Sequence, residues 1–444
     1  MQDEFAAIFG QVVDAARGHG VSDVEAILAG ETAALTRFAN NAIHQNVSER
    51  NVHLSVRPVI GGRTARASTN RLDSASIRRV VEEAVAITRL TEPDPELPEM
   101  AGSAGSPAEL RYFAGTAQAT PEHRARAVAE AIGVVEAAGQ TAAGIYSTGD
   151  AFFGLMNSRG AAAWHGETMA RFSITAMAPD SSGWAKQSAC DLRELDPAVL
   201  ARSAARKAAE SRSPRELPAG RYTVVLEPAA VLDLVGQMFG DFSATAIRDG
   251  RSFLNDRLGK KLFGNVTIHD DVRHPLQSGA PFDGEGVPRR GLTLVENGVV
   301  RDIAYCRQAA LAAGAVPTGH GFPVPNEMGE APVNIVIAGG DVPVEKMIRS
   351  TDRGILVTRF WYIREVDPYE KIFTGMTRDG TFLIEKGELA GGVRNFRFNQ
   401  GLMEMLSNVE ALSRAERATG EEAIDLVAPA MRVGEFNFTE VTRF

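Results

Sequence analysis

Residues that could do chemistry gather between residues 249 and 297, where charged side chains alternate with glycines. The six-residue segment 269–274 includes His269, Asp270, Asp271 and His274. Histidines and carboxylates are common ligands for a metal ion. Histidines five residues apart point to opposite faces of a strand and well apart on a helix, so only an irregular loop could bring both imidazoles to one ion. We therefore expect hydrogen bonding and turn formation here. Metal binding or catalysis by His269, Asp271 and His274 is the alternative.

Asp283 and Glu285 form a second candidate pair. Residues two apart project to one side of an extended segment, and two carboxylates placed in this way can act as an acid and a base. Gly284 and Gly286 flank Glu285 and favour a structural turn. We expect the turn, with catalysis by the pair as the alternative.

Several charged side chains of the predicted loops are candidates for binding a partner or a peptide, because polar loops often carry binding residues. They are Arg251, Asp256, Arg257, Asp270 and His320. The two adjacent aspartates, Asp270 and Asp271, are expected to anchor nearby backbone N–H groups or to pair with these arginines. His320 lies between Gly319 and Gly321 with no acid beside it, which predicts an ordinary loop histidine.

Three further sites have simple structural explanations. His165 and Glu167 share one face of an extended segment, which permits two metal ligands or an acid–base pair, but a solvated strand face beside Trp164 is the favoured interpretation. Cys306 has no histidine near it in the sequence and is as readily a small buried residue as a nucleophile. Glu227 lies at an expected helix start, where a carboxylate interacts favourably with the helix dipole.

Alternating helical and extended segments must position these side chains. Apolar residues at helical spacing predict helices at 3–17, 74–88, 121–138, 197–211 and 228–238. Alternating apolar and polar residues predict strands at 24–28, 35–38, 43–47, 52–56, within 144–177, and at 221–226, 334–338, 354–361 and 380–384, with turns at 40–41, 61–62 and 157–160. The predicted fold class is α+β, with two domains that each pack helices on an antiparallel or mixed sheet. The stretch 211–220 is rich in Pro, Ser, Gly and charge, which places the boundary near residue 218, between domains 1–218 and 219–444.

Composition excludes several classes of function. A formal net charge of -9 argues against direct binding of nucleic acid, which generally needs a basic surface. No apolar run is long enough to span a bilayer, and the acidic N-terminus does not resemble a secretory signal. The two cysteines, Cys190 and Cys306, form no CxxC motif and no disulfide framework. These features predict a cytoplasmic protein without membrane contact.

The sequence features together resemble the TldD/PmbA family, the modulators of DNA gyrase, which includes metallopeptidase subunits. The resemblance runs over nearly the full chain and is specific in the order and spacing of its pieces. In the first half it rests on RFANNAIHQ at 37–45, GGR at 61–63 and NSRG at 157–160. In the second half it rests on GRSFL at 250–254, DRLGK at 256–260, VTIHDD at 266–271 and PFDGEG at 281–286.

The resemblance implies a two-domain α+β protein that works as a dimer. In the catalytic branch of the family, a helix after the domain boundary carries His-Glu-x-x-x-His, and a cysteine near the C-terminal end completes a zinc site that cleaves unfolded peptides. Histidines four residues apart share a helix face, and the glutamate acts on the zinc-bound water. This chain contains no His-Glu pair, no histidine between His165 and His269, and no cysteine after Cys306.

The chain is therefore similar to the PmbA (TldE) branch, whose members lack the zinc motif. This resemblance predicts a subunit that binds no cofactor itself and pairs with a zinc-bearing, TldD-like subunit, or with itself, to process peptides. Two alternatives are a self-contained hydrolase with a relocated His/Asp site and a regulator or scaffold without enzymatic activity.

Overall fold

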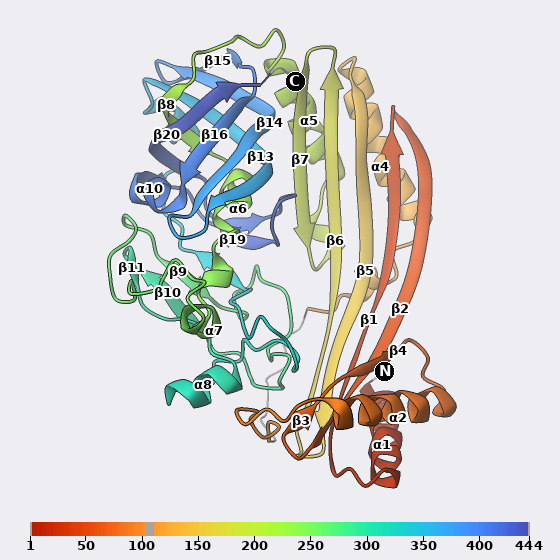
Figure 1. Cartoon of the computed structure of the whole chain (residues 1–444). Helices are drawn as coiled ribbons and strands as arrows, with labels where there is room; N and C mark the ends of the chain where they lie inside the picture. The colour runs from red at the N-terminus through yellow and green to blue at the C-terminus, as the bar shows by residue number, and fades with distance from the viewer. Residues whose placement is uncertain (1, 103–110, 443–444) are drawn as a thin grey trace.

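The first half of the protein is built on one long antiparallel sheet. The computed structural model describes residues 2–102 and 111–442. The sheet has seven strands in the order β3 (Arg63–Thr64), β2 (Ala42–Ile60), β1 (Asp23–Ala39), β5 (Thr141–Asn157), β6 (Ala162–Ala178) and β7 (Ser181–Ala189), with β4 (Ala67–Thr69) paired to β2. Its strands run along most of the molecule (Figure 1).

Helices cover this sheet in two places. The helices are α1 (Gln2–Gly18), α2 (Ser74–Leu90), α3 (Ala114–Ala117), α4 (Pro121–Ala137), the short 3-10 turn η1 (Leu192–Glu194) and α5 (Pro197–Glu210). Apolar faces of α4 and α5 pack on β5, β6 and β7, whereas α1 and α2 pack near one end of the sheet (Figure 1). Gly183 lets α5 approach β7 closely, because a Cβ there would lie 2.1 Å from the carbonyl oxygen of Ala204.

The second half contains a seven-stranded sheet and a six-stranded sheet, both mixed. The larger has the order β13 (Arg353–Asp367), β8 (Gly220–Leu226), β20 (Met431–Val441), β16 (Phe396–Gly401), β14 (Ile372–Glu385) and β15 (Glu388–Gly392), with β17 (Val409–Leu412) paired to β20. Because β13 also pairs with β14, five of these strands close into a ring. The ring encloses phenylalanines packed against one another: Phe360 meets Phe398 edge-to-face, with ring centroids 4.9 Å apart, and stacks on Phe436 at 5.6 Å.

The smaller sheet lies beside the ring and carries most of the polar loops. Its order is β11 (Val299–Val300), β10 (Leu292–Glu296), β9 (Ile268–Asp270), β12 (Ile335–Ile337), β19 (Leu426–Ala428) and β18 (Glu416–Ala418). The helices of this half are α6 (Pro228–Val235), the 3-10 turn η2 (Phe239–Asp241), α7 (Ala244–Arg248), α8 (Arg307–Ala313), α9 (Val344–Arg349) and α10 (Leu402–Ser407). None of the helices in the described parts of the chain is long and apolar enough to cross a membrane.

The predicted α+β class is confirmed, with helices packed on antiparallel and mixed sheets. The four short strands predicted between residues 24 and 56 were wrong in extent: they merge into β1 and β2, joined at the predicted Asn40–Asn41 turn. The strands of the long sheet end at Ala189, and those of the other sheets begin at Gly220. The division into two domains near residue 218 stays a prediction.

Helix α4 begins with a side-chain cap that can be tested. The Thr120 hydroxyl oxygen accepts a hydrogen bond from the N–H of His123 at 3.2 Å, and Pro121 occupies the first turn. Replacing Thr120 by Ala removes this acceptor, so we expect a loss of about 1 kcal/mol in the free energy of unfolding. Urea unfolding followed by circular dichroism measures the loss. The Thr120→Ser control retains the hydroxyl and should stay near wild type; equal losses in both variants would contradict a capping role.

Candidate functional site

The polar loops of the second half enclose a buried pair, Asp270 and His320. The two residues are each 1% exposed, and Nε2 of His320 lies 3.0 Å from Oδ1 of Asp270. Oδ2 of Asp270 accepts the N–H groups of Val333 and Asn334, each at 2.8 Å. Burial alone would raise the pKa of Asp270, but His320, Arg289 and the Asn334 N–H outweigh burial and hold it below its usual range.

The sequence predicted an ordinary loop histidine because no acid lies beside His320, but the structure pairs His320 with Asp270. The acid lies 50 residues away in the sequence and is reached only when the loop after α8 folds over the end of β9. Asp270 does anchor backbone N–H groups, as expected. Because both side chains are buried, we assign the Asp270–His320 pair a structural function beneath the surface and no direct contact with a peptide.

Asp283 organises a tight turn. Its Oδ1 accepts the N–H groups of Glu285 and Val287, each at 2.9 Å, and its Oδ2 accepts the N–H of Gly321 at 2.7 Å. This is the structural turn that the flanking glycines predicted. Glu285 follows on the turn, is 5% exposed, and accepts the N–H of Arg307 at 2.8 Å on Oε2.

Glu285 and Cys306 line a cavity of about 160 Å³ between the two halves of the chain. Its wall contains Thr64, Glu92, Asp94, Leu97, Glu285, Cys306, Gln308, Phe322, Val324, Pro325, Asn326 and Gly329. Cys306 caps α8 by accepting the Ala309 N–H on its sulfur, and burial together with Glu330 raises the pKa of its thiol to about 12. A neutral, buried thiol of this kind is not an activated nucleophile.

Glu285 should make stability depend on pH. Burial and the charge of Asp283 raise its pKa to about 8, against a usual value of 4.5. The folded protein therefore holds this proton more tightly than the unfolded chain. The resulting stabilisation is complete below pH 4.5 and is lost as the pH rises through about 8. We expect the free energy of unfolding to fall by roughly 2 kcal/mol between pH 6 and pH 9, and Glu285→Gln to remove most of this fall. Urea unfolding at several pH values tests both statements; identical profiles would contradict them.

The structure does not bring His269 and His274 together. His269 lies in β9, where Nδ1 is 3.4 Å from the hydroxyl of Thr293. His274 lies in the following turn, and its Nδ1 accepts the N–H of Leu276 at 3.2 Å. Burial lowers the pKa of His274, with Asp271 opposing this effect. His274 thus bonds within its own turn, in line with the turn interpretation, whereas His269 lies in a strand and has its partner on the neighbouring strand β10.

The arginines near the start of the polar stretch find partners other than the expected aspartates. Arg251 donates to Asp249 at 3.0 Å. Arg257 pairs with Glu370 at 3.2 Å. Of the two alternatives expected for Asp270 and Asp271, both aspartates accept backbone N–H groups, and neither pairs with Arg251 or Arg257. Arg251 and Asp256 are exposed, and Arg257 is half-buried.

His165 and Glu167 do form a pair on β6. Nε2 of His165 lies 3.4 Å from Oε2 of Glu167, which also accepts the N–H of Gly279 at 2.6 Å. Since His165 is 6% exposed, the favoured interpretation of a solvated strand face was wrong. The pair instead holds the 279 loop of the second half against the long sheet.

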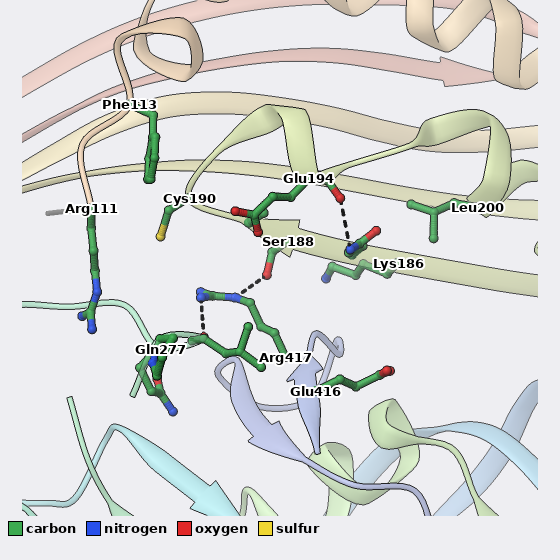
Figure 2. Close-up of a pocket in the computed structure, with 14 residues that line it drawn as sticks. Arg111, Phe113, Lys186, Ser188, Cys190, Glu194, Leu200, Gln277, Glu416 and Arg417 are labelled. Carbon is green, nitrogen blue, oxygen red and sulfur yellow. Dashed lines mark hydrogen bonds between the residues drawn. The ribbon is translucent and has the colours of Figure 1, made fainter. Parts of the chain in front are cut away.

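A larger cavity of about 470 Å³ lies between β7 and the second half (Figure 2). Its lining carries Arg111, Lys186 and Arg417 beside Cys190 (Figure 2). Each cation already has protein partners: Arg417 donates to Ser188 at 2.9 Å, Lys186 donates to the Gly420 carbonyl at 2.6 Å, and Arg111 donates to carbonyl groups of the 272–279 loop. These side chains hold the two halves of the chain together.

Two groups of buried ionic residues escaped the sequence analysis. Glu25 pairs with Arg57 across the β1–β2 register and also with Arg66. Glu330 accepts hydrogen bonds from Ser243, Thr245 and the N–H of Cys306. The sequence could have predicted the first group, because the correct β1–β2 register places Glu25 opposite Arg57. No pattern in the residues around Glu330 predicts its hydrogen bonds.

The sequence resemblance matches helix α6 to the helix that carries the zinc motif in the catalytic branch. Here its buried polar residue is Asp233, whose carboxylate accepts the N–H of Phe360 at 3.0 Å and that of Glu422 at 3.4 Å. Burial raises the pKa of Asp233 to about 7 against these hydrogen bonds. Four residues on, Gln237 donates to the carbonyl of Glu422 at 2.9 Å. Asp233 and Gln237 both hold the 420–422 loop through hydrogen bonds. Because their polar atoms are engaged in this way, these two residues do not fit a zinc site.

No group of three or more His, Cys, Asp or Glu side chains within residues 2–102 and 111–442 is arranged to hold a metal ion.

The closed ring, the long antiparallel sheet and the smaller mixed sheet define an α+β protein. Three family models match the chain: PmbA/TldA metallopeptidase domain 1 at residues 24–88, the central domain at 117–212 and the C-terminal domain at 219–440. The last covers half of the chain. This chain belongs to the PmbA/TldD family, which confirms the resemblance seen in the sequence.

Similar proteins agree with this assignment. A metalloprotease of Methanothermobacter thermautotrophicus is 27% identical over 58% of this chain and 59% of its own length, so the match spans less than two thirds of that relative. Metalloprotease PmbA of Escherichia coli O157:H7 is 23% identical over 84% of this chain and 83% of its own length.

Two solved structures share the fold. TldE from Thermococcus kodakarensis has a TM-score of 0.89 at 18% identity and matches 97% of this chain and 100% of its own. A Thermotoga maritima protein described as a modulator of DNA gyrase has a TM-score of 0.88 at 21% identity and matches 98% of this chain and 100% of its own.

Proposed function

We propose that this chain is the zinc-free subunit of a TldD-type metalloprotease that processes unfolded peptides. The observation that carries the proposal is family membership combined with an α6 that has no histidine and whose Asp233 is engaged by backbone N–H groups. Zinc is accordingly assigned to the partner subunit, and this chain holds none.

An open sheet edge supports a contribution to peptide binding. From residue 42 to residue 53, β2 pairs with β1 on one side, whereas β3 and β4 pair only with residues 54–60 on the other. The outer edge of residues 42–53 is therefore unpaired among the described strands, and most of its side chains are exposed. An extended peptide can add to such an edge through backbone hydrogen bonds, with little demand on its sequence.

Surface charges of the second half are the proposed contacts with the partner or the peptide. Arg251, Asp256 and Arg257 occupy one polar turn segment, and Arg251 and Asp256 are exposed. Asp270 and His320 would support nearby loops from inside. A TldD-like subunit is the proposed partner, with a homodimer as the alternative, and the cytoplasm is the proposed compartment.

The relocated hydrolase has no specific observation in its favour. His269 contacts Thr293, and His274 accepts the N–H of Leu276. The carboxylate of Asp283 accepts three backbone N–H groups. The decisive experiment is affinity purification of this chain from its native cells, with mass spectrometry and zinc analysis of the proteins that accompany it. We expect a zinc-loaded relative that carries His-Glu-x-x-x-His, and peptide cleavage by the complex only. Recovery of the chain alone, with stoichiometric zinc and peptidase activity, would overturn the proposal.

A further inference from the structure

Glu285 is the buried acid in the wall of this cavity. Oε2 of Glu285 accepts the Arg307 N–H, but Oε1 accepts no hydrogen bond from the described residues. Glu285 lines the cavity and is 5% exposed, so the unused oxygen belongs to a buried carboxyl group at the cavity wall. A carboxyl group with so little access to water is stabilised by a hydrogen-bond donor from a ligand or by a proton of its own.

The rest of the wall indicates which donor would fit. Asp94 and the exposed Glu92 add two acids, whereas no Lys, Arg or His within residues 2–102 and 111–442 lines the cavity. Asp94 already contacts the second half of the chain, because its Oδ2 accepts a hydrogen bond from Nε2 of Gln308 at 3.2 Å. Arg57 and Arg307 act on Glu285 through their charge, but burial and Asp283 outweigh them and raise its pKa to about 8. The local balance therefore favours an added positive charge.

Apolar side chains occupy another part of the wall. Leu97, Phe322, Val324 and Pro325 line the cavity with hydrophobic surface. Its volume of about 160 Å³ is that of roughly five water molecules, enough for an ammonium group and a few carbon atoms. A hydrated metal ion would leave this apolar surface uncovered, whereas an alkylammonium group covers it and donates hydrogen bonds to the acids.

We propose that this cavity binds the primary ammonium group of a peptide, with Glu285 as its main acceptor and Asp94 as a second acidic group. The site goes beyond the zinc-free subunit function, because it requires neither zinc nor a partner. A peptide N-terminus and a lysine side chain share this chemistry.

Calorimetric titration of the full chain with three peptides tests the site and separates the two sources. The peptides are Ala-Ala-Ala-amide, its N-acetylated form, and N-acetyl-Ala-Lys-Ala-amide. We expect at least one amine-bearing peptide to bind about tenfold or more tightly than the neutral peptide, because a charge-assisted hydrogen bond forms. Preference for the first identifies the N-terminus as the ligand, and preference for the third identifies lysine.

Proton release gives a second measurement. Glu285 is largely protonated at pH 7 and should ionise when the ammonium group binds, so close to one proton per peptide should be released. Titrations in buffers with different ionisation enthalpies measure this release. Glu285→Gln keeps the side-chain shape and an acceptor for the Arg307 N–H. It should abolish both the tenfold preference and the proton release.

Two further variants complete the test. Asp94→Asn should weaken amine binding by a smaller factor, since Asp94 already accepts from Gln308. The matched control is Glu345→Gln, which changes an exposed residue of α9 and should bind like wild type. Equal affinity for all three peptides, or an unchanged preference in Glu285→Gln, would overturn the proposal. Failure to recover a zinc-bearing partner would leave it standing, because the titrations use this chain alone.

Discussion

Replacing Asp270 by Ala is expected to destabilise the protein by about 3–5 kcal/mol, the range seen when one member of a buried charge network is removed. The carboxylate accepts N–H groups from Val333 and Asn334 and contacts His320, and all of these partners would lose their acceptor in a dry environment. Urea unfolding of wild type and variant at pH 7 measures the loss.

Asp271 offers a matched control one residue away. Among the described residues its carboxylate accepts only the N–H of Arg273, in a half-exposed turn, so Asp271→Ala should cost less than about 1 kcal/mol. Because the pKa of Asp270 is lowered in the folded state, its contribution is complete above the usual pKa of 3.8 and is lost as the pH falls below that value. Similar losses for the two variants would show that Asp270 does not organise these loops.

Replacing Glu25 by Ala should have a comparable effect, about 3–5 kcal/mol. Glu25 is 1% exposed and accepts two hydrogen bonds from Arg57, at 3.1 and 3.0 Å, and another from Arg66. The variant would leave two guanidinium groups close together without a counter-charge. Arg66 also donates to the carbonyl of Val324, so hydrogen exchange in the 320–330 loop should become faster as well.

Asp23, two residues earlier on β1, provides the comparison. A guanidinium nitrogen of Arg159 lies 2.9 Å from the carboxylate of Asp23. The side chain of Asp23 is 29% exposed and that of Arg159 is 48% exposed. Exposed pairs contribute little, so Asp23→Ala should cost less than about 1 kcal/mol and leave exchange in the 320–330 loop unchanged. Faster exchange in both variants, or in neither, would contradict the link through Arg66.

Local patterns in the sequence predicted most helices well. The helix predicted at 74–88 is observed at Ser74–Leu90, and that predicted at 121–138 ends one residue earlier, at Ala137. Amphipathic spacing and capping residues are properties of neighbouring residues, which explains this success. The helix predicted from 228 to 238 ends at Val235. Met238 is nevertheless fully buried, so the spacing of apolar residues predicted burial correctly even beyond the end of the helix.

The candidate site was predicted less well, because its chemistry depends on residues far apart in the chain. The Asp283 turn is local and was expected from Gly284 and Gly286. The partners of His320 and Glu25 lie on other elements and could be assigned only with strand register and loop closure in hand. The polar loop residues were predicted to bind a partner or a peptide, but Asp270 and His320 of this set are buried.

The sequence by itself determined the α+β class, the family and the absence of the His-Glu-x-x-x-His motif, since each is written in local spacing or residue identity. Tertiary structure alone decided which acids are buried, which cations they meet and where a cavity remains between the two halves of the chain. These properties arise because folding brings distant charges into a low-dielectric interior, where the partner of each group determines its protonation and its contribution to stability.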